Sequence, residues 1–210
     1  MNTFKDIIRR SWFTPKKWAF WRALIVCFCV FSIVGHWIEL GYCFIIDAMF
    51  DVVEDDYVVW FDPWWHPYWV YGFGAVFMTL VFEPIKEHLS RNSSSLWGTI
   101  LQTFVIATLV SMLLELGFGL LVNQPDAAGN YPYWNNEKLP LNIFNQAWLV
   151  NDVFLGLAAT IYVWLVFPLV CAGFERLKPR TANIVFAVIV IAFGLCCLTS
   201  YLEIIASGRL

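Results

Sequence analysis

Residues 23–49 read ALIVCFCVFSIVGHWIELGYCFIIDAM, and the length of this apolar run decides the fold. An α-helix rises about 1.5 Å per residue, and the hydrocarbon core of a bilayer is about 30 Å thick, so roughly 20 apolar residues cross it. The run is longer than that, and its only acidic residues are Glu39 and Asp47. It therefore predicts a transmembrane helix.

Four further apolar segments have the length and composition of a span, or nearly so. They cover residues 68–82, 96–122, 147–174 and 182–206. The segment at 68–82 is the weakest, because Glu83 and Pro84 end its apolar run early. We predict an all-α fold, a polytopic membrane helical bundle of about five transmembrane helices.

The composition supports a chain that is solvated by lipid. Hydrophobic residues make up 60% of the 210 residues and charged residues 14%, whereas soluble domains are nearer 45–50% and about 25%. Aromatic residues reach 19%, and the 12 tryptophans are typical of membrane interfaces. The net charge of −3 does not indicate a nucleic-acid partner.

Lysine and arginine predict the orientation. Cytoplasmic loops of membrane proteins carry an excess of these residues. In a five-span arrangement one side holds only Lys138 and Arg209. The other 11 fall on the opposite side: six in residues 1–22, then Lys86, Arg91, Arg176, Lys178 and Arg180. We therefore expect a multi-pass protein of the plasma membrane with its N-terminus inside and its C-terminus outside.

The same pattern divides the chain in two. Residues 1–22 mix basic and aromatic side chains, which predicts a cytoplasmic segment lying along the inner membrane surface. Residues 23–210 are predicted to form a single transmembrane domain.

The cysteines and histidines give no metal-binding pattern. The six cysteines lie in or beside apolar runs without a CxxC spacing, so we expect them to pack as small hydrophobes. His36 lies three residues before Glu39, and a buried, hydrogen-bonded histidine is expected there rather than a ligand. We predict no metal and no cofactor.

Two of the spans share a motif. Residues 35–42 read GHWIELGY and residues 111–118 read SMLLELGF, so both follow a small-x-x-x-Glu-Leu-Gly-aromatic pattern. Each span is followed by an acidic, aromatic loop that ends in a proline. We infer a parallel duplication of a helical hairpin, which is a known way of building transporters.

The motif places Glu39 and Glu115 in the outer half of the bilayer. A charged acid near the centre of a span costs at least about 2.5–3.5 kcal/mol. Either the two acids line an outward-opening pocket for a cation, a proton or an amine-bearing substrate, or they are protonated clamps between helices. Further pocket residues are predicted to be Asn142 and Asn145 as polar groups at the entrance, with Tyr71 and Trp148 as walls.

The order of these motifs resembles the CmpB-like family of integral membrane proteins, named for ABC-transporter type IV. The resemblance covers roughly residues 30–170, although the family's glycine after the Leu-Asn step is replaced here by Asn145 or absent. It implies a polytopic, transporter-like protein. It rests on Gly35–Glu39, Pro67 with Tyr71-Gly72-Phe73-Gly74, Leu114-Glu115 with Gly119, Tyr133-Trp134, Leu141-Asn142, and Trp148.

Three classes of function compete. No zinc-protease, serine-hydrolase or phosphate-loop motif is present, so we expect no enzymatic activity and no ATP hydrolysis by this chain. We expect a membrane transport component, either permease-like or a substrate-binding membrane subunit. The alternative is an accessory or assembly subunit of another membrane complex. The predicted partners are the lipid bilayer, a separate ATP-binding subunit or other membrane protein, and a second copy of the chain.

Overall fold

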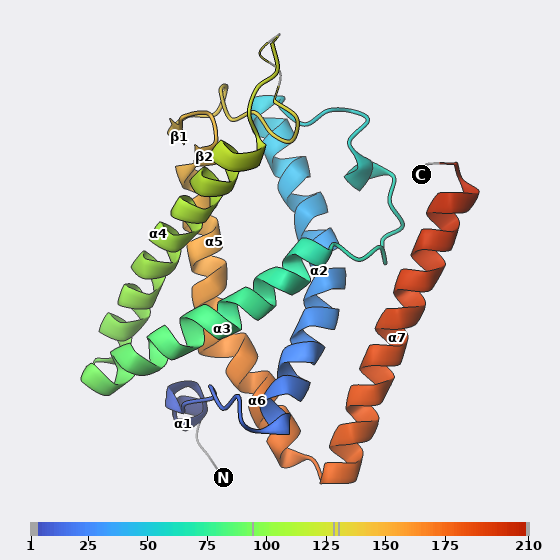
Figure 1. The fold of residues 1–210 in the computed structure, drawn as a ribbon. Helices are drawn as coiled ribbons and strands as arrows, with labels where there is room; N and C mark the ends of the chain where they lie inside the picture. Colours follow the sequence, from blue (N-terminus) through green and yellow to red (C-terminus); the bar gives the residue numbers. More distant parts are fainter. Residues whose placement is uncertain (1–3, 94, 128, 130, 209–210) are drawn as a thin grey trace. The chain divides into compact units, whose positions relative to one another are not determined.

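The computed structural model describes residues 4–93, 95–127, 129 and 131–208, and it confirms the predicted all-α class (Figure 1). Arg209, which entered the orientation argument, lies outside the described residues. A 3₁₀ turn at Val58–Trp60 and a two-stranded hairpin, β1 (Asn142–Ile143) and β2 (Ala147–Trp148), join the helices. The α-helices are α1 (Phe4–Arg9), α2 (Trp18–Phe50), α3 (Trp69–Asn92), α4 (Leu96–Val122), α5 (Leu149–Ile161), α6 (Phe167–Arg176) and α7 (Pro179–Ala206).

Four helical stretches among the described residues are long and apolar enough to cross a membrane. They are α2, α4, the continuous stretch Leu149–Arg176 and α7. Each corresponds to a predicted span, and α4 matches the prediction for residues 96–122 at both ends. The predicted span at 68–82 corresponds to α3, which is not among the four.

Helix α3 does not end where its apolar run ends. It continues through Pro84 to Asn92. Proline is tolerated within membrane helices because neighbouring groups satisfy the carbonyl that it leaves without a donor. The expectation that Lys86 lies in an inner loop is therefore wrong: Lys86 is helical and only 1% exposed.

The chain divides into two compact units, which are described separately. Unit 1 comprises residues 1–84 and 165–210, and unit 2 comprises residues 85–164. Helix α3 contributes its first sixteen residues to unit 1 and the rest to unit 2.

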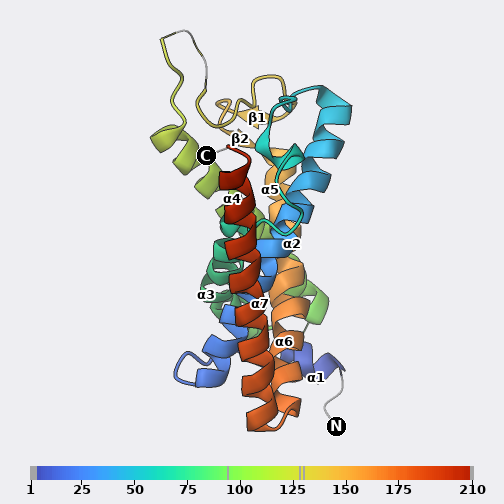
Figure 2. The same cartoon turned by 90° about the vertical axis from the view of Figure 1, so that its right-hand side faces the viewer.

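In unit 1 the N-terminal segment packs against α6. Arg10 forms a double hydrogen bond with Glu175 at 2.7 and 2.8 Å, and Trp12 is buried with its indole donating to the Ile7 carbonyl. Phe20 packs edge-on against Phe167. Helices α6 and α7 are joined by a short connection (Figure 2). Contacts from buried aromatics therefore tie this segment to the helices.

The segment between α2 and α3 folds back along α2 (Figure 1). The Trp37 indole donates to the Trp64 carbonyl at 2.6 Å, and the Tyr68 amide donates to the Ser32 carbonyl at 2.8 Å. Ser32 lies near the middle of the 33-residue helix. Helix α3 therefore begins at mid-height of α2, which explains why its apolar run is short.

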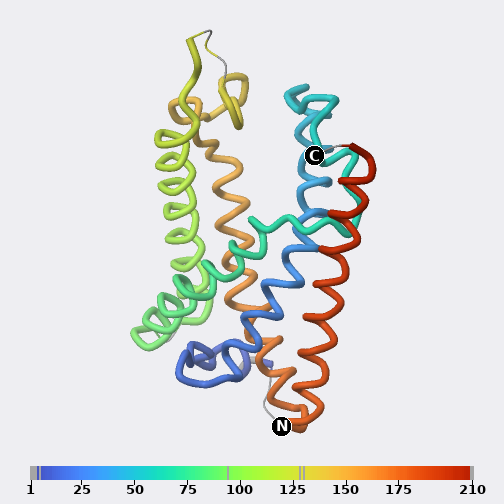
Figure 3. Tube along the Cα trace, turned by 45° about the vertical axis from the view of Figure 1, so that its right-hand side comes forward, coloured from blue at the N-terminus to red at the C-terminus, as the bar shows by residue number. Residues whose placement is uncertain are grey.

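In unit 2, α4 and α5 lie side by side (Figure 3). Their contact face repeats every fourth residue, the spacing that places side chains on one face of a helix. It carries small or polar residues, so the backbones approach closely. The faces consist of Thr99, Thr103, Ala107, Ser111 and Glu115 on α4, and of Asp152, Gly156 and Thr160 on α5.

Gly119 of α4 meets the second loop at a distance that only glycine allows. A β-carbon built on Gly119 would lie 2.6 Å from Gln146 Oε1 and 2.7 Å from its Cβ. Gly117, two residues earlier on the same helix, has nothing within 4 Å of the equivalent position. Only one of the two glycines is therefore required by packing.

We expect Gly119→Ala to destabilise the protein by about 1–3 kcal/mol, because the added methyl group must displace Gln146. Gly117→Ala is the matched control, and the better helix propensity of alanine should leave stability unchanged or raise it by up to about 1 kcal/mol. Unfolding of the purified variants in detergent measures both effects. Equal effects at the two positions would show that the close approach at Gly119 is not required.

Candidate functional site

Glu39 of α2 is surrounded by hydrogen-bond donors in unit 1. The Tyr71 hydroxyl donates to Oε2, the Tyr57 hydroxyl to Oε1 at 3.5 Å, and the Cys43 thiol to Oε1 at 3.7 Å. The bonds from Tyr57 and Cys43 are long and therefore weak. The structure therefore brings together two predicted site residues, Glu39 and Tyr71.

The approach of Tyr71 to Glu39 depends on glycine. Tyr71 is the third residue of α3, and a side chain at Gly35 would overlap the Tyr71 ring. Gly72, the next residue, packs in the same way against Ser32 of α2. The small residues of the Gly35–Glu39 motif thus allow the second helix to reach the acid.

Tyr57, which lies in the loop outside the spans, is affected by the same acid. Burial disfavours the phenolate and the nearby Glu39 carboxylate repels it, which together raise the pKa of Tyr57 to about 12. Tyr57 therefore remains a hydroxyl donor toward Glu39 throughout the neutral range.

His36 of α2, which the sequence analysis singled out, belongs to a polar cluster beside Glu39. The sequence analysis did not single out the other members of this cluster, which are His66, Asp62 and Ser200. His36 is 1% exposed, as expected, but its Nδ1 has no hydrogen-bond partner among the described residues. Its ring lies 4.6 Å from the ring of Tyr68. His66 Nδ1 is 2.6 Å from Ser200 Oγ, but its Nε2 is 4.0 Å from Asp62 Oδ2. Ser200 is fully buried. This serine, histidine and aspartate therefore lack both the access and the geometry of a hydrolytic triad.

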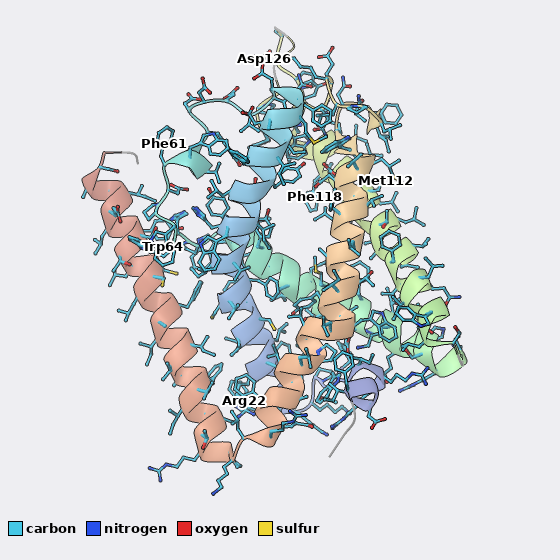
Figure 4. The ribbon with its side chains drawn as sticks, turned by 180° about the vertical axis from the view of Figure 1, so that it is seen from behind. Arg22, Phe61, Trp64, Met112, Phe118 and Asp126 are labelled. Atoms are coloured by element: carbon cyan, nitrogen blue, oxygen red, sulfur yellow. The ribbon has the colours of Figure 1, made fainter. Side chains whose placement is uncertain are left out.

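Two aromatic side chains of the segment between α2 and α3 are more exposed than the polar cluster beside Glu39. Phe61 and Trp64 are 57% and 64% exposed (Figure 4). Aromatic rings at such positions are typical of the membrane interface. These two rings of the loop are thus exposed, whereas His36 and Ser200 of the cluster are buried.

Glu115 of α4 meets α5 in unit 2. Asn151 Nδ2 donates to Glu115 Oε2 at 3.4 Å, and the backbone amide of Trp148 also hydrogen-bonds the carboxyl group. The carboxyl group of Asp152 is within hydrogen-bonding reach of Glu115. Asp152 is fully buried, and neither of its oxygens accepts a bond from a donor among the described residues.

The other predicted site residues are held by bonds within the second loop. Asn142 Nδ2 donates to the Leu139 carbonyl at 2.9 Å, and the Trp148 indole donates to the Pro140 carbonyl at 2.8 Å. The backbone of Asn145 is left-handed, with a φ of 59°, at the turn between β1 and β2. These residues shape the loop, and Trp148 connects it to Glu115 through its backbone.

A buried amide pair that the sequence analysis missed anchors this loop to the end of α4. Asn123 Nδ2 donates to Gln146 Oε1 at 2.9 Å, and Gln146 Nε2 donates to the Asn123 carbonyl at 2.9 Å. The Trp134 indole donates to the Gln146 carbonyl at 2.8 Å. Gly119, which precedes Asn123 by four residues, was the available signal, since it marks where another side chain must approach.

Lys86 is a second missed residue. Its Nζ donates to the Val163 carbonyl at 2.8 Å and lies 5.5 Å from the centre of the Trp164 ring. Residues 162–166 form a π-helix, in which the Val163 carbonyl would bond residue 168, and that residue is Pro168, without an N–H. Lys86 supplies the missing donor. Pro168 within an apolar run was the sequence signal for this irregularity.

The helix pairs α2–α3 and α4–α5 bind their glutamates through equivalent positions. Each glutamate lies on the first helix and is met by the third residue of the second helix, Tyr71 for Glu39 and Asn151 for Glu115. The two acids belong to different units, so a single pocket that contains both stays a prediction. A cavity of about 40 Å³ lies in unit 1 between the N-terminal segment and α6, and none of the six predicted site residues lines it.

We expect Tyr71→Phe to destabilise the protein by about 1–2 kcal/mol, because it removes a hydroxyl donor to a carboxylate while keeping the ring beside Gly35. Tyr57→Phe, the control, removes a longer and more exposed bond to the same acid and should cost less than about 0.5 kcal/mol. Thermal unfolding in detergent compares them. An equal loss would mean that Tyr71 has no special role at Glu39.

Comparison with known proteins agrees with this architecture. A family model matches residues 26–201, which include both glutamates, all of α4, and most of α2 and α7. No curated protein and no solved structure matches the chain. With four helices of spanning length in the part that the structure describes, the chain is a multi-pass membrane protein related to transporters. It belongs to the family described as Putative ABC-transporter type IV.

Proposed function

We propose that this chain is a membrane transport component, permease-like or a substrate-binding membrane subunit, and not an enzyme. Glu39 and Glu115 are its ligand-binding groups. One observation supports this most strongly: no Lys or Arg among the described residues forms an ion pair with either acid. Their partners are hydroxyl, thiol, amide and carboxyl groups.

A carboxylate in an apolar region without a basic partner attracts a positive charge, since the cost of burying it falls when a cation or proton is bound. The ligand that fits is therefore a cation or an amine-bearing solute. The tyrosines around Glu39 suit this ligand, because aromatic rings attract cations. With the N-terminus inside, both acids lie toward the outer face of the plasma membrane.

The energy source must come from another subunit if the chain works as an ABC-type transporter, because it has no phosphate-loop motif. Helices α3 and α4 are separated only by residues 93–95, which leaves little loop for coupling. The N-terminal segment, which packs against α6 and carries Arg10, is the larger available surface for an ATP-binding subunit.

A second candidate function is an accessory subunit of another membrane complex. It is favoured by α7, in which only 6% of the most apolar window is buried within the chain. Such a face fits lipid, a second copy or a partner helix. An accessory subunit does not require a soluble ligand, and this difference separates the two candidates.

Ligand-dependent thermal stabilisation tests the proposal. We expect a cation or amine in a solute panel to raise the unfolding temperature of the purified chain, since a ligand at 100 times its Kd adds about 2.7 kcal/mol. Glu39→Gln or Glu115→Gln should abolish this shift, because the amide removes the negative charge. Glu203→Gln, at an exposed acid of α7, is the control and should retain it.

Two results would contradict the proposal. One is a shift that both glutamine variants retain in full, which would make the acids structural clamps. The other is a panel in which no solute stabilises the wild-type chain, which would favour the accessory subunit.

A further inference from the structure

Glu115 and Asp152 form an acid pair with unequal surroundings. The available donors, Asn151 Nδ2 and the Trp148 amide, serve Glu115. Asp152 is fully buried, and its two oxygens receive no hydrogen bond from the described residues. The neighbour that remains for Asp152 is the Glu115 carboxyl group, which can bond it only if a proton lies between them.

The elements around the pair provide no compensating charge. Glu115 is the only titratable residue of α4, Asp152 is the only one of α5, and β2 contains none. These are the elements that pack together at this end of unit 2. Two carboxylates in contact in an apolar setting cannot both be ionised, since their repulsion adds to the cost of burial.

We propose that Glu115 and Asp152 are a proton-binding site that holds one shared proton at neutral pH and can release it. The proton converts the repulsion of two carboxylates into one O–H···O hydrogen bond, and it satisfies the oxygen of Asp152. That this proton is the coupling ion rests on the transport function proposed above, whereas the proton binding does not.

Glu39 provides a contrast within the same chain. Its hydrogen-bond partners are two phenols and a thiol, and no second acid is among them. The two glutamates share a motif and differ in their neighbours. We therefore expect the shared proton at Glu115 and not at Glu39.

The test uses N,N′-dicyclohexylcarbodiimide, a lipophilic reagent that modifies carboxyl groups in their protonated form. The full chain in native membranes is treated across a range of pH, and modified residues are located by mass spectrometry. Glu115, the more accessible partner, should be labelled at pH 7. Above the midpoint of titration the rate should fall about tenfold per pH unit, as for a single proton.

Asp152→Asn removes the neighbouring acid and supplies an amide donor in its place. Both changes favour ionised Glu115, so its labelling at pH 7 should fall about tenfold or more, equivalent to one pH unit. Glu137→Gln, at an exposed acid of the second loop, should leave the labelling unchanged.

Absence of label at Glu115 in the wild type would overturn the proposal and requires no variant that must fold. Unchanged labelling of Glu115 in a folded Asp152→Asn protein would also overturn it. Neither result depends on a solute, so a failure here is distinguishable from a failure of the proposed transport function.

Discussion

The cost of a polar group in hydrocarbon governs this structure. An unsatisfied donor or acceptor costs several kcal/mol there, and a charge costs at least about 2.5–3.5 kcal/mol. In this chain, side chains of neighbouring helices donate hydrogen bonds to the two glutamates. Tyr71 reaches Glu39, and Asn151 reaches Glu115. Buried threonines such as Thr103 and Thr160 donate to carbonyls of their own helix.

Close approach of helices is what makes these bonds possible. Gly35 admits Tyr71, Gly119 admits Gln146, and Gly156 admits Thr108. In each hairpin the glycine lies one turn from the acid or from its partner on the same helix. The motif at residues 35–42 thus combines a group that needs a partner with a small residue that lets one in, whereas in the second copy the required glycine, Gly119, lies just beyond residues 111–118. The surroundings of the two glutamates differ because the second helices differ. Helix α3 presents the phenol of Tyr71, whereas α5 presents the amide of Asn151 and a second acid, Asp152.

Apolar length and period were enough to predict the all-α class and the four long spans, and α4 begins and ends where the sequence indicated. The end of α3 differs from the prediction because a drop in hydropathy at Glu83 does not end the helix: a buried charge and a proline are compatible with a continuing helix. The sequence placed Tyr71 and Glu39 in the same predicted pocket, and the structure shows them in contact. The pairing of Glu115 with Asp152, the amides of Asn123 and Gln146, and the bond from Lys86 to Val163 depend on how helices align, which spacing within one segment does not encode.

We propose above that this chain serves a transport system. The most direct test is to purify the tagged chain from its native membrane in a mild detergent and to identify every co-purifying polypeptide by mass spectrometry. We expect an ATP-binding subunit in near-stoichiometric amount. Recovery of a membrane complex of a different activity, with no ATP-binding subunit, would contradict it.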